Sequence, residues 1–174
     1  YKSIRFVLKA SYHNYHNLPD KDRSFFTFYN TEFSENFLMK NLLDKIFHKP
    51  YFVKKEEVVE DQKNEPDYYV RHNNRIYLFE NKDVLIAKKI KNSGNIDEIN
   101  KVLKSKFLEV NNKHIGIGQL ITSIEHIISN NFVFDDYVNH KRNLTIYPIL
   151  LVSDRIFEIP GMNFKLNNWY LESI

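Results

Sequence analysis

Apolar and polar positions follow two different periods along this chain, and the period separates expected strands from expected helices. Residues 68–72 and 75–79 are rich in aromatic and β-branched side chains, which favours strands. Asn73-Asn74 between them can supply the positive φ angles of a two-residue turn. The pattern therefore predicts a β-hairpin over residues 68–79.

Three other segments carry apolar residues at helical spacing. We expect helices over residues 33–47, 96–110 and 117–128. Thr31 or Ser34 is available as the N-terminal cap of the first helix. The third segment has the most regular apolar stripe in the chain.

The remaining apolar runs predict additional elements. We expect strands at residues 3–8, 51–59 and 84–86, a strand or core-covering segment at 25–29, and a strand and short helix in the tail, 154–174. The run 144–152 is the most apolar in the chain, and Pro148 predicts that its strand begins at or just after the proline. A near-continuous apolar strand is typical of a sheet covered on both faces. The order of elements predicts one layered α/β domain over residues 1–174, with its core at about 31–152.

The hairpin register brings charged residues together. If Asn73-Asn74 is the turn, Asp67 lies opposite Glu80, with Cβ atoms about 4.5–5.5 Å apart. Lys82 leaves the same face of the strand as Glu80, because side chains alternate along a strand. Opposed like charges are destabilising, so this arrangement needs a reason beyond folding. A divalent cation such as Mg²⁺ is the usual reason, since one or two carboxylates commonly hold it.

This order of residues, Pro66-Asp67, a gap of strand length and then Glu80-Asn81-Lys82, resembles the PD-(D/E)XK superfamily of restriction-endonuclease-like phosphodiesterases. The resemblance implies a restriction-endonuclease-like three-layer fold, with a central mixed β-sheet flanked by helices. It also implies a nuclease that uses Mg²⁺, with Mn²⁺ as a substitute. Asp67 and Glu80 would be the metal ligands, and Lys82 would be the catalytic lysine.

Two further residues match positions that often lie near the site in this superfamily. An acid from the first core helix often joins the metal site, which the resemblance implies for Glu35, with Glu32 as the second choice. The alternative for Glu35 is an acid in the first helical turn that reaches solvent over the helix end. Gln119 resembles a glutamine on the helix after the Glu-x-Lys strand. An ordinary solvent-facing glutamine is its alternative.

Lys88, Lys89 and Lys91 follow the acids closely in sequence, in an expected turn that contains Ser93-Gly94. Their charge makes them candidates for contacts with nucleic-acid phosphates. The alternative is a solvated loop without a ligand.

Composition narrows the class of protein. A chain of 174 residues with 43% hydrophobic and 27% charged residues is ordinary for a soluble globular protein, and no apolar run is long enough to cross a membrane. The absence of cysteine excludes disulfides and thiolate zinc sites and fits a cytoplasmic protein. A net charge of +3 is too small to indicate nucleic-acid binding by itself.

The sequence therefore predicts a metal-dependent nuclease that hydrolyses phosphodiester bonds, with DNA favoured over RNA. The alternative is a noncatalytic nucleic-acid-binding or protein-interaction domain on the same fold. We expect nucleic acid as the partner and no membrane, and the oligomeric state stays open, a homodimer included.

Overall fold

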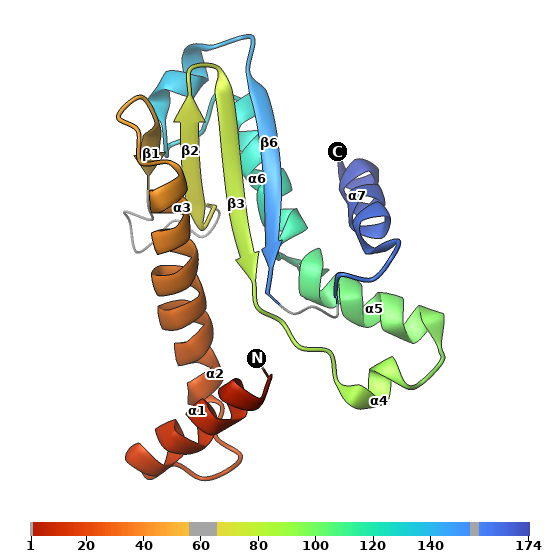
Figure 1. Ribbon diagram of the computed structural model, residues 1–174. Coiled ribbons are helices and arrows are strands. Elements are labelled where there is room, and N and C mark those ends of the chain that lie inside the picture. The colour runs from red at the N-terminus through yellow and green to blue at the C-terminus, as the bar shows by residue number, and fades with distance from the viewer. Residues whose placement is uncertain (1, 56–65, 154–156) are drawn as a thin grey trace. The chain divides into compact units, whose positions relative to one another are not determined.

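A computed structural model describes residues 2–55, 66–153 and 157–174. The chain forms two compact units, Tyr1–Asp44 and Lys45–Ile174 (Figure 1). None of the helices in the described part of the chain is both long and apolar enough to span a membrane.

The first unit is helical. It contains α1 (Lys2–Tyr15), α2 (Ser24–Phe28), the π-helix η1 (Tyr29–Met39) and most of α3 (Lys40–Ile46). The strand expected at residues 3–8 is wrong, because this segment is the start of α1. The guanidinium carbon of Arg5 lies 4.5 Å from the ring centroid of Tyr29, and the Tyr12 ring stacks on Phe28 with centroids 5.3 Å apart. Arg5 and Tyr12 are seven residues apart, so both lie on the same face of α1. A short apolar run cannot be assigned by periodicity alone.

The helix expected at residues 33–47 begins much earlier than its pattern indicated. The chain is helical from Ser24 onward, with a carboxylate oxygen of Asp22 accepting the Ser24 N–H at 2.8 Å. That side chain also accepts the Ser24 hydroxyl, and these two bonds lower the Asp22 pKa. The caps expected at Thr31 and Ser34 are therefore wrong. Residues 25–29 form a core-covering helix rather than a strand, with Phe25 buried.

The second unit is a mixed α/β structure built on a central four-stranded sheet. Its strands are β1 (Val53–Lys55), β2 (Tyr68–His72), β3 (Arg75–Lys82) and β6 (Thr145–Val152), in the order β1-β2-β3-β6. Strand β2 pairs antiparallel with both β1 and β3, whereas β6 pairs parallel with β3. Residues 56–59 of the strand expected at 51–59 lie outside the described part.

The predicted hairpin is confirmed, register included. Tyr68 pairs with Phe79 and Val70 pairs with Tyr77, and Asn73 in the turn has a φ of 53°. Pairing in register places Tyr69, Ile76 and Leu78 on one face of the sheet, where they pack in one core cluster. The opposite face carries Phe79, whose ring lies 5.9 Å from that of Phe47.

Helix α6 (Ile117–Ile128) covers the first of these faces and has the bounds that its apolar stripe predicts. The other helices of this unit are α4 (Lys88–Lys91), α5 (Ile96–Phe107), the 3₁₀ helix η2 (Asp136–His140) and α7 (Met162–Ser173). A second core cluster joins α5, α6 and α7 through buried side chains, among them Phe107, Ile121 and Trp169.

Several boundaries differ from those expected. Helix α5 ends at Phe107, because the small hairpin of β4 (Glu109–Val110) and β5 (Lys113–His114) follows it. Residues 84–86 are not a strand, and residues 88–91 are a short helix rather than a turn. Strand β6 begins at Thr145, three residues before Pro148. The proline is tolerated because β6 lies at an edge of the four-stranded sheet, where alternate N–H groups point away from the ladder.

Candidate active site

The clearest polar feature of the second unit is a buried ion pair at the end of β3. The Glu80 side chain is completely buried, and the Lys82 Nζ atom donates to its Oε1 atom at 2.5 Å. The two residues are two positions apart on one strand, so their side chains share a face as predicted. The Lys82 side chain is 18% exposed, so the ammonium side of the pair is the one that meets solvent.

Asp67 is held at the same end of the hairpin. It immediately precedes β2, and its Oδ2 atom accepts the backbone N–H of Asn81 at 2.7 Å. Because Tyr68 pairs with Phe79, continuing the register by one residue places Asp67 beside Glu80. The three predicted residues Asp67, Glu80 and Lys82 are therefore brought together.

Unequal strand lengths explain how this site forms. Strand β3 continues for three residues beyond Phe79, the partner of the first residue of β2. On its other side, β3 stays paired with β6 up to Lys82 and Val152. The overhanging part of β3 is thus fixed by β6 from one side and by the Asp67 carboxylate from the other.

The beginning of α6 packs against the Lys82 stem. A Cβ atom added at Gly116 would lie 3.5 Å from Lys82 Cγ and 3.0 Å from the Phe107 carbonyl oxygen, so the backbone approaches closely here. Gly116 has a φ of 56°, which favours glycine. The N-terminus of this helix favours negative charge, which suits both a carboxylate and a phosphate.

Gln119 lies in the first turn of α6 and closes this helix end. Its Oε1 atom accepts the Gly116 N–H at 2.9 Å, and the side chain is half-buried. Gln119 is therefore joined to the site through Gly116, which neighbours Lys82. The amide oxygen is engaged in capping, and a role of Gln119 in the site stays a prediction.

The other predicted residues lie on other elements of the chain. Glu35 is half-buried in η1, in the first unit, and its place in the site stays a prediction. Because the helix begins at Ser24, Glu35 is not in a first helical turn, so that alternative is wrong. Lys88 and Lys89 are exposed on α4 and Lys91 is half-buried, and their phosphate contacts also stay predictions.

Asp83, an acid that the site prediction did not include, is also buried. Its side chain is only 7% exposed and directly follows Lys82 at the end of β3. An acid next to the Glu-x-Lys motif was visible in the sequence, but its burial was not. Asn81 between Glu80 and Lys82 is also buried, and its N–H holds Asp67.

The donor set fits a hard divalent cation in part. Asp67 and Glu80 supply carboxylate oxygens, and Mg²⁺ is commonly held by one or two carboxylates together with water and substrate phosphate. Over residues 2–55, 66–153 and 157–174, no group of three or more histidine or acidic side chains is placed to hold a metal ion. The hairpin thus supplies two carboxylates to a metal ion, and water or substrate oxygen atoms could complete its coordination.

Comparison of the chain with protein-family models, with curated proteins and with solved structures finds no match. Membership of the PD-(D/E)XK superfamily is therefore not shown by relatives. The functional argument depends on the geometry of Asp67, Glu80 and Lys82.

Proposed function

We propose that this protein is a metal-dependent phosphodiesterase that cleaves nucleic acid, with DNA favoured over RNA. The observation that carries the proposal is the completely buried Glu80 carboxylate, paired with Lys82 and adjoining Asp67. A buried ion pair stabilises a fold no better than apolar side chains of the same volume. The retention of this pair therefore supports a role beyond folding, and catalysis is the role that we propose.

Each residue has a role in this proposal. Asp67 and Glu80 bind the metal ion, and Lys82 positions the attacking water or accepts its proton. A bound Mg²⁺ would polarise the phosphate and lower the pKa of a coordinated water. The N-terminus of α6 adds positive potential beside Lys82, where the phosphate would lie. Gln119 keeps that helix end in place by capping Gly116.

The order of elements supports the finer proposal of a restriction-endonuclease-like fold. The hairpin that carries the acids is followed by α5 and α6 and then by β6, which returns parallel to β3. Strand β6 holds the end of β3 in the sheet, because it pairs with β3 up to the last residue, Lys82. Glu80 and Lys82 therefore lie on an ordered strand rather than on a loop.

The test is a cleavage series with purified protein. Supercoiled DNA, linear DNA, single-stranded DNA and RNA are incubated with Mg²⁺, Mn²⁺ or a chelator. We expect cleavage that requires the metal and is lost in Lys82→Met and in Asp67→Asn. Lys101→Met, at an exposed position on α5, is the matched control and should cleave like the wild type.

Two outcomes would overturn the proposal. One is full cleavage by Lys82→Met, and the other is cleavage that persists in the chelator. Nucleic-acid binding that is equal with and without metal, and without cleavage, would instead support the noncatalytic alternative.

A further inference from the structure

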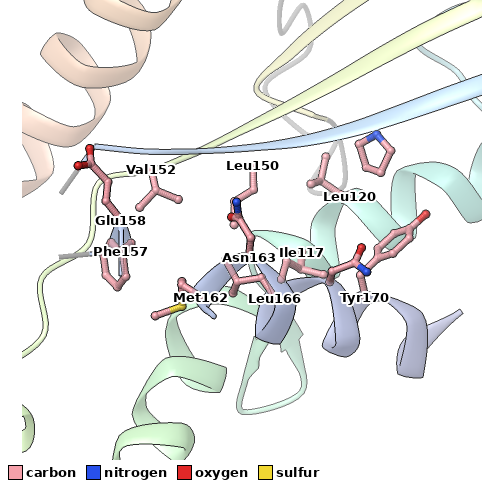
Figure 2. A pocket seen from close by; sticks show the side chains of 12 residues that line it. Ile117, Leu120, Leu150, Val152, Phe157, Glu158, Met162, Asn163, Leu166 and Tyr170 are labelled. Atoms are coloured by element: carbon pink, nitrogen blue, oxygen red, sulfur yellow. The ribbon is translucent and has the colours of Figure 1, made fainter. Parts of the chain in front are cut away.

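An apolar groove lies between the edge strand β6 and helix α7, with the start of α6 as its floor. Figure 2 shows Leu150 and Val152 on β6 pointing toward side chains of α7. The groove has a volume of about 570 Å³. The described residues that line it are Ile117, Leu120, Pro148, Leu150, Val152, Phe157, Glu158, Met162, Asn163, Leu166, Asn167 and Tyr170. Ligand pockets commonly have volumes of about 300–1,000 Å³.

The groove adjoins the candidate active site. Leu150 pairs with Glu80 and Val152 pairs with Lys82 in the parallel register, so these four side chains leave one face of adjacent strands. Adjacent strands are about 4.8 Å apart. Leu150 and Lys82 both lie next to Gly116, since each has a carbon atom 3.5 Å from the position that a Cβ atom added to this glycine would occupy. A ligand in the groove would therefore lie one strand away from the proposed catalytic groups.

The lining has the chemistry of a site for a neutral, planar group. Leu150 and Leu166 supply apolar contacts and Tyr170 supplies an aromatic ring, while the Asn163 and Asn167 amides can donate and accept hydrogen bonds. Among the described lining residues, Glu158 carries the one full charge, and it is exposed near Phe157 at one end (Figure 2). A negative charge there disfavours a phosphate in the groove.

We propose that this groove accepts one unstacked nucleobase of the substrate while the adjoining phosphate lies at Asp67, Glu80 and Lys82. This inference rests on the proposed nuclease function and defines its substrate class. A base can reach such a groove only from a single strand or from a locally unpaired site. The substrate is therefore single-stranded or unpaired nucleic acid, with the base held by apolar contact and by amide hydrogen bonds.

The test compares two single-stranded DNA probes of equal length, one with normal bases and one with abasic sugars. Dissociation constants are measured by fluorescence anisotropy with the Asp67→Asn protein in Mg²⁺, which prevents cleavage under the proposed mechanism and keeps the Glu80–Lys82 ion pair. Asn163→Trp in this background places a large ring in the groove from an exposed position on α7. Asn168→Trp, on the same helix but outside the lining, is the matched control.

We expect the base-bearing probe to bind about tenfold more tightly than the abasic probe, as stacking of a base on a protein side chain provides. Asn163→Trp should abolish this preference, and Asn168→Trp should keep it. Equal affinity of the two probes for the Asp67→Asn protein would overturn the inference. A preference that survives Asn163→Trp would overturn it as well.

Failure of this inference and failure of the nuclease proposal are distinguishable. Cleavage that depends on Lys82, without any preference for the base-bearing probe, would contradict the base-binding groove and support the nuclease proposal. A base preference that Asn163→Trp abolishes, without metal-dependent cleavage, would contradict the nuclease proposal and support the base-binding groove.

Discussion

At the scale of single residues, the most informative feature is the difference between Glu80 and Lys82. Glu80 is completely buried, whereas the Lys82 side chain keeps some contact with solvent. Water can therefore solvate the Lys82 ammonium, whereas the Glu80 carboxylate is stabilised by hydrogen bonds within the protein. This asymmetry means that a variant at position 82 changes both the proposed chemistry and the stability of the strand.

We predict that Lys82→Ala lowers the free energy of unfolding by about 3–5 kcal/mol, because it removes the ammonium that donates to a completely buried carboxylate. The double variant Glu80→Gln with Lys82→Met should recover most of this loss, since it removes both charges and keeps similar volumes. Urea denaturation of the three proteins measures the difference. A Lys82→Ala protein as stable as the wild type would contradict the role of the ion pair.

At the scale of elements, a second buried network connects β2 to η2. The Tyr69 hydroxyl donates to Asp135 Oδ2 at 2.9 Å, and Arg71 Nε donates to the same oxygen at 2.7 Å. The Asp135 carboxylate also accepts the Tyr137 N–H and begins η2. This network anchors the segment after α6 on strand β2 of the sheet.

Burial and the neighbouring Asp135 carboxylate raise the pKa of Tyr69 far above the ordinary value of 10.0. The folded phenol therefore holds its proton more tightly than the unfolded phenol. The associated stability is complete below about pH 10 and is lost as the pH rises above that value.

We predict that the free energy of unfolding falls steeply above pH 10 in the wild type and less steeply in Tyr69→Phe. The variant should also lose about 1.5–3 kcal/mol at neutral pH, since it removes a hydrogen bond to a carboxylate. Denaturant titrations at several pH values test both effects. Tyr77→Phe is the control, because Tyr77 stacks on Tyr147 and is half-buried. An identical alkaline slope in Tyr69→Phe would contradict this account.

At the scale of the whole molecule, the proposed residues are divided between two compact units. Asp67, Glu80, Lys82 and Gln119 belong to the second unit, and Glu35 belongs to the helical first unit. Two carboxylates satisfy the minimum that Mg²⁺ requires from a protein, and a third would strengthen its binding. The contribution of Glu35 is therefore measurable as metal affinity.

We predict that Mg²⁺ raises the melting temperature of the wild type, since a ligand that binds only the folded state stabilises it by mass action. The shift should vanish in Asp67→Asn and become smaller in Glu35→Gln. Glu125→Gln, at an exposed position on α6, is the matched control and should keep the full shift. A full shift in Glu35→Gln, equal to that of Glu125→Gln, would remove Glu35 from the site.

Local patterns were sufficient for part of this structure. The hairpin register and the bounds of α6 could be predicted, because a two-residue asparagine turn and an uninterrupted apolar stripe depend on neighbouring residues. The clustering of Asp67, Glu80 and Lys82 followed from the register alone. The strand expected at residues 3–8 failed, since its apolar residues are exposed on a helix whose inner face carries Arg5 and Tyr12.

The hairpin, the helix α6 and the three clustered side chains were predictable from the sequence, because each depends on residues close in the chain. The folded structure was needed to show that Glu80 is fully buried, that β6 extends the pairing of β3 up to Lys82, and that Gly116 packs against the Lys82 stem. Those features join segments far apart in sequence, and burial depends on all of them together. The groove beside the site arises for the same reason, since strand β6 and helix α7 form it only after both have packed on α6.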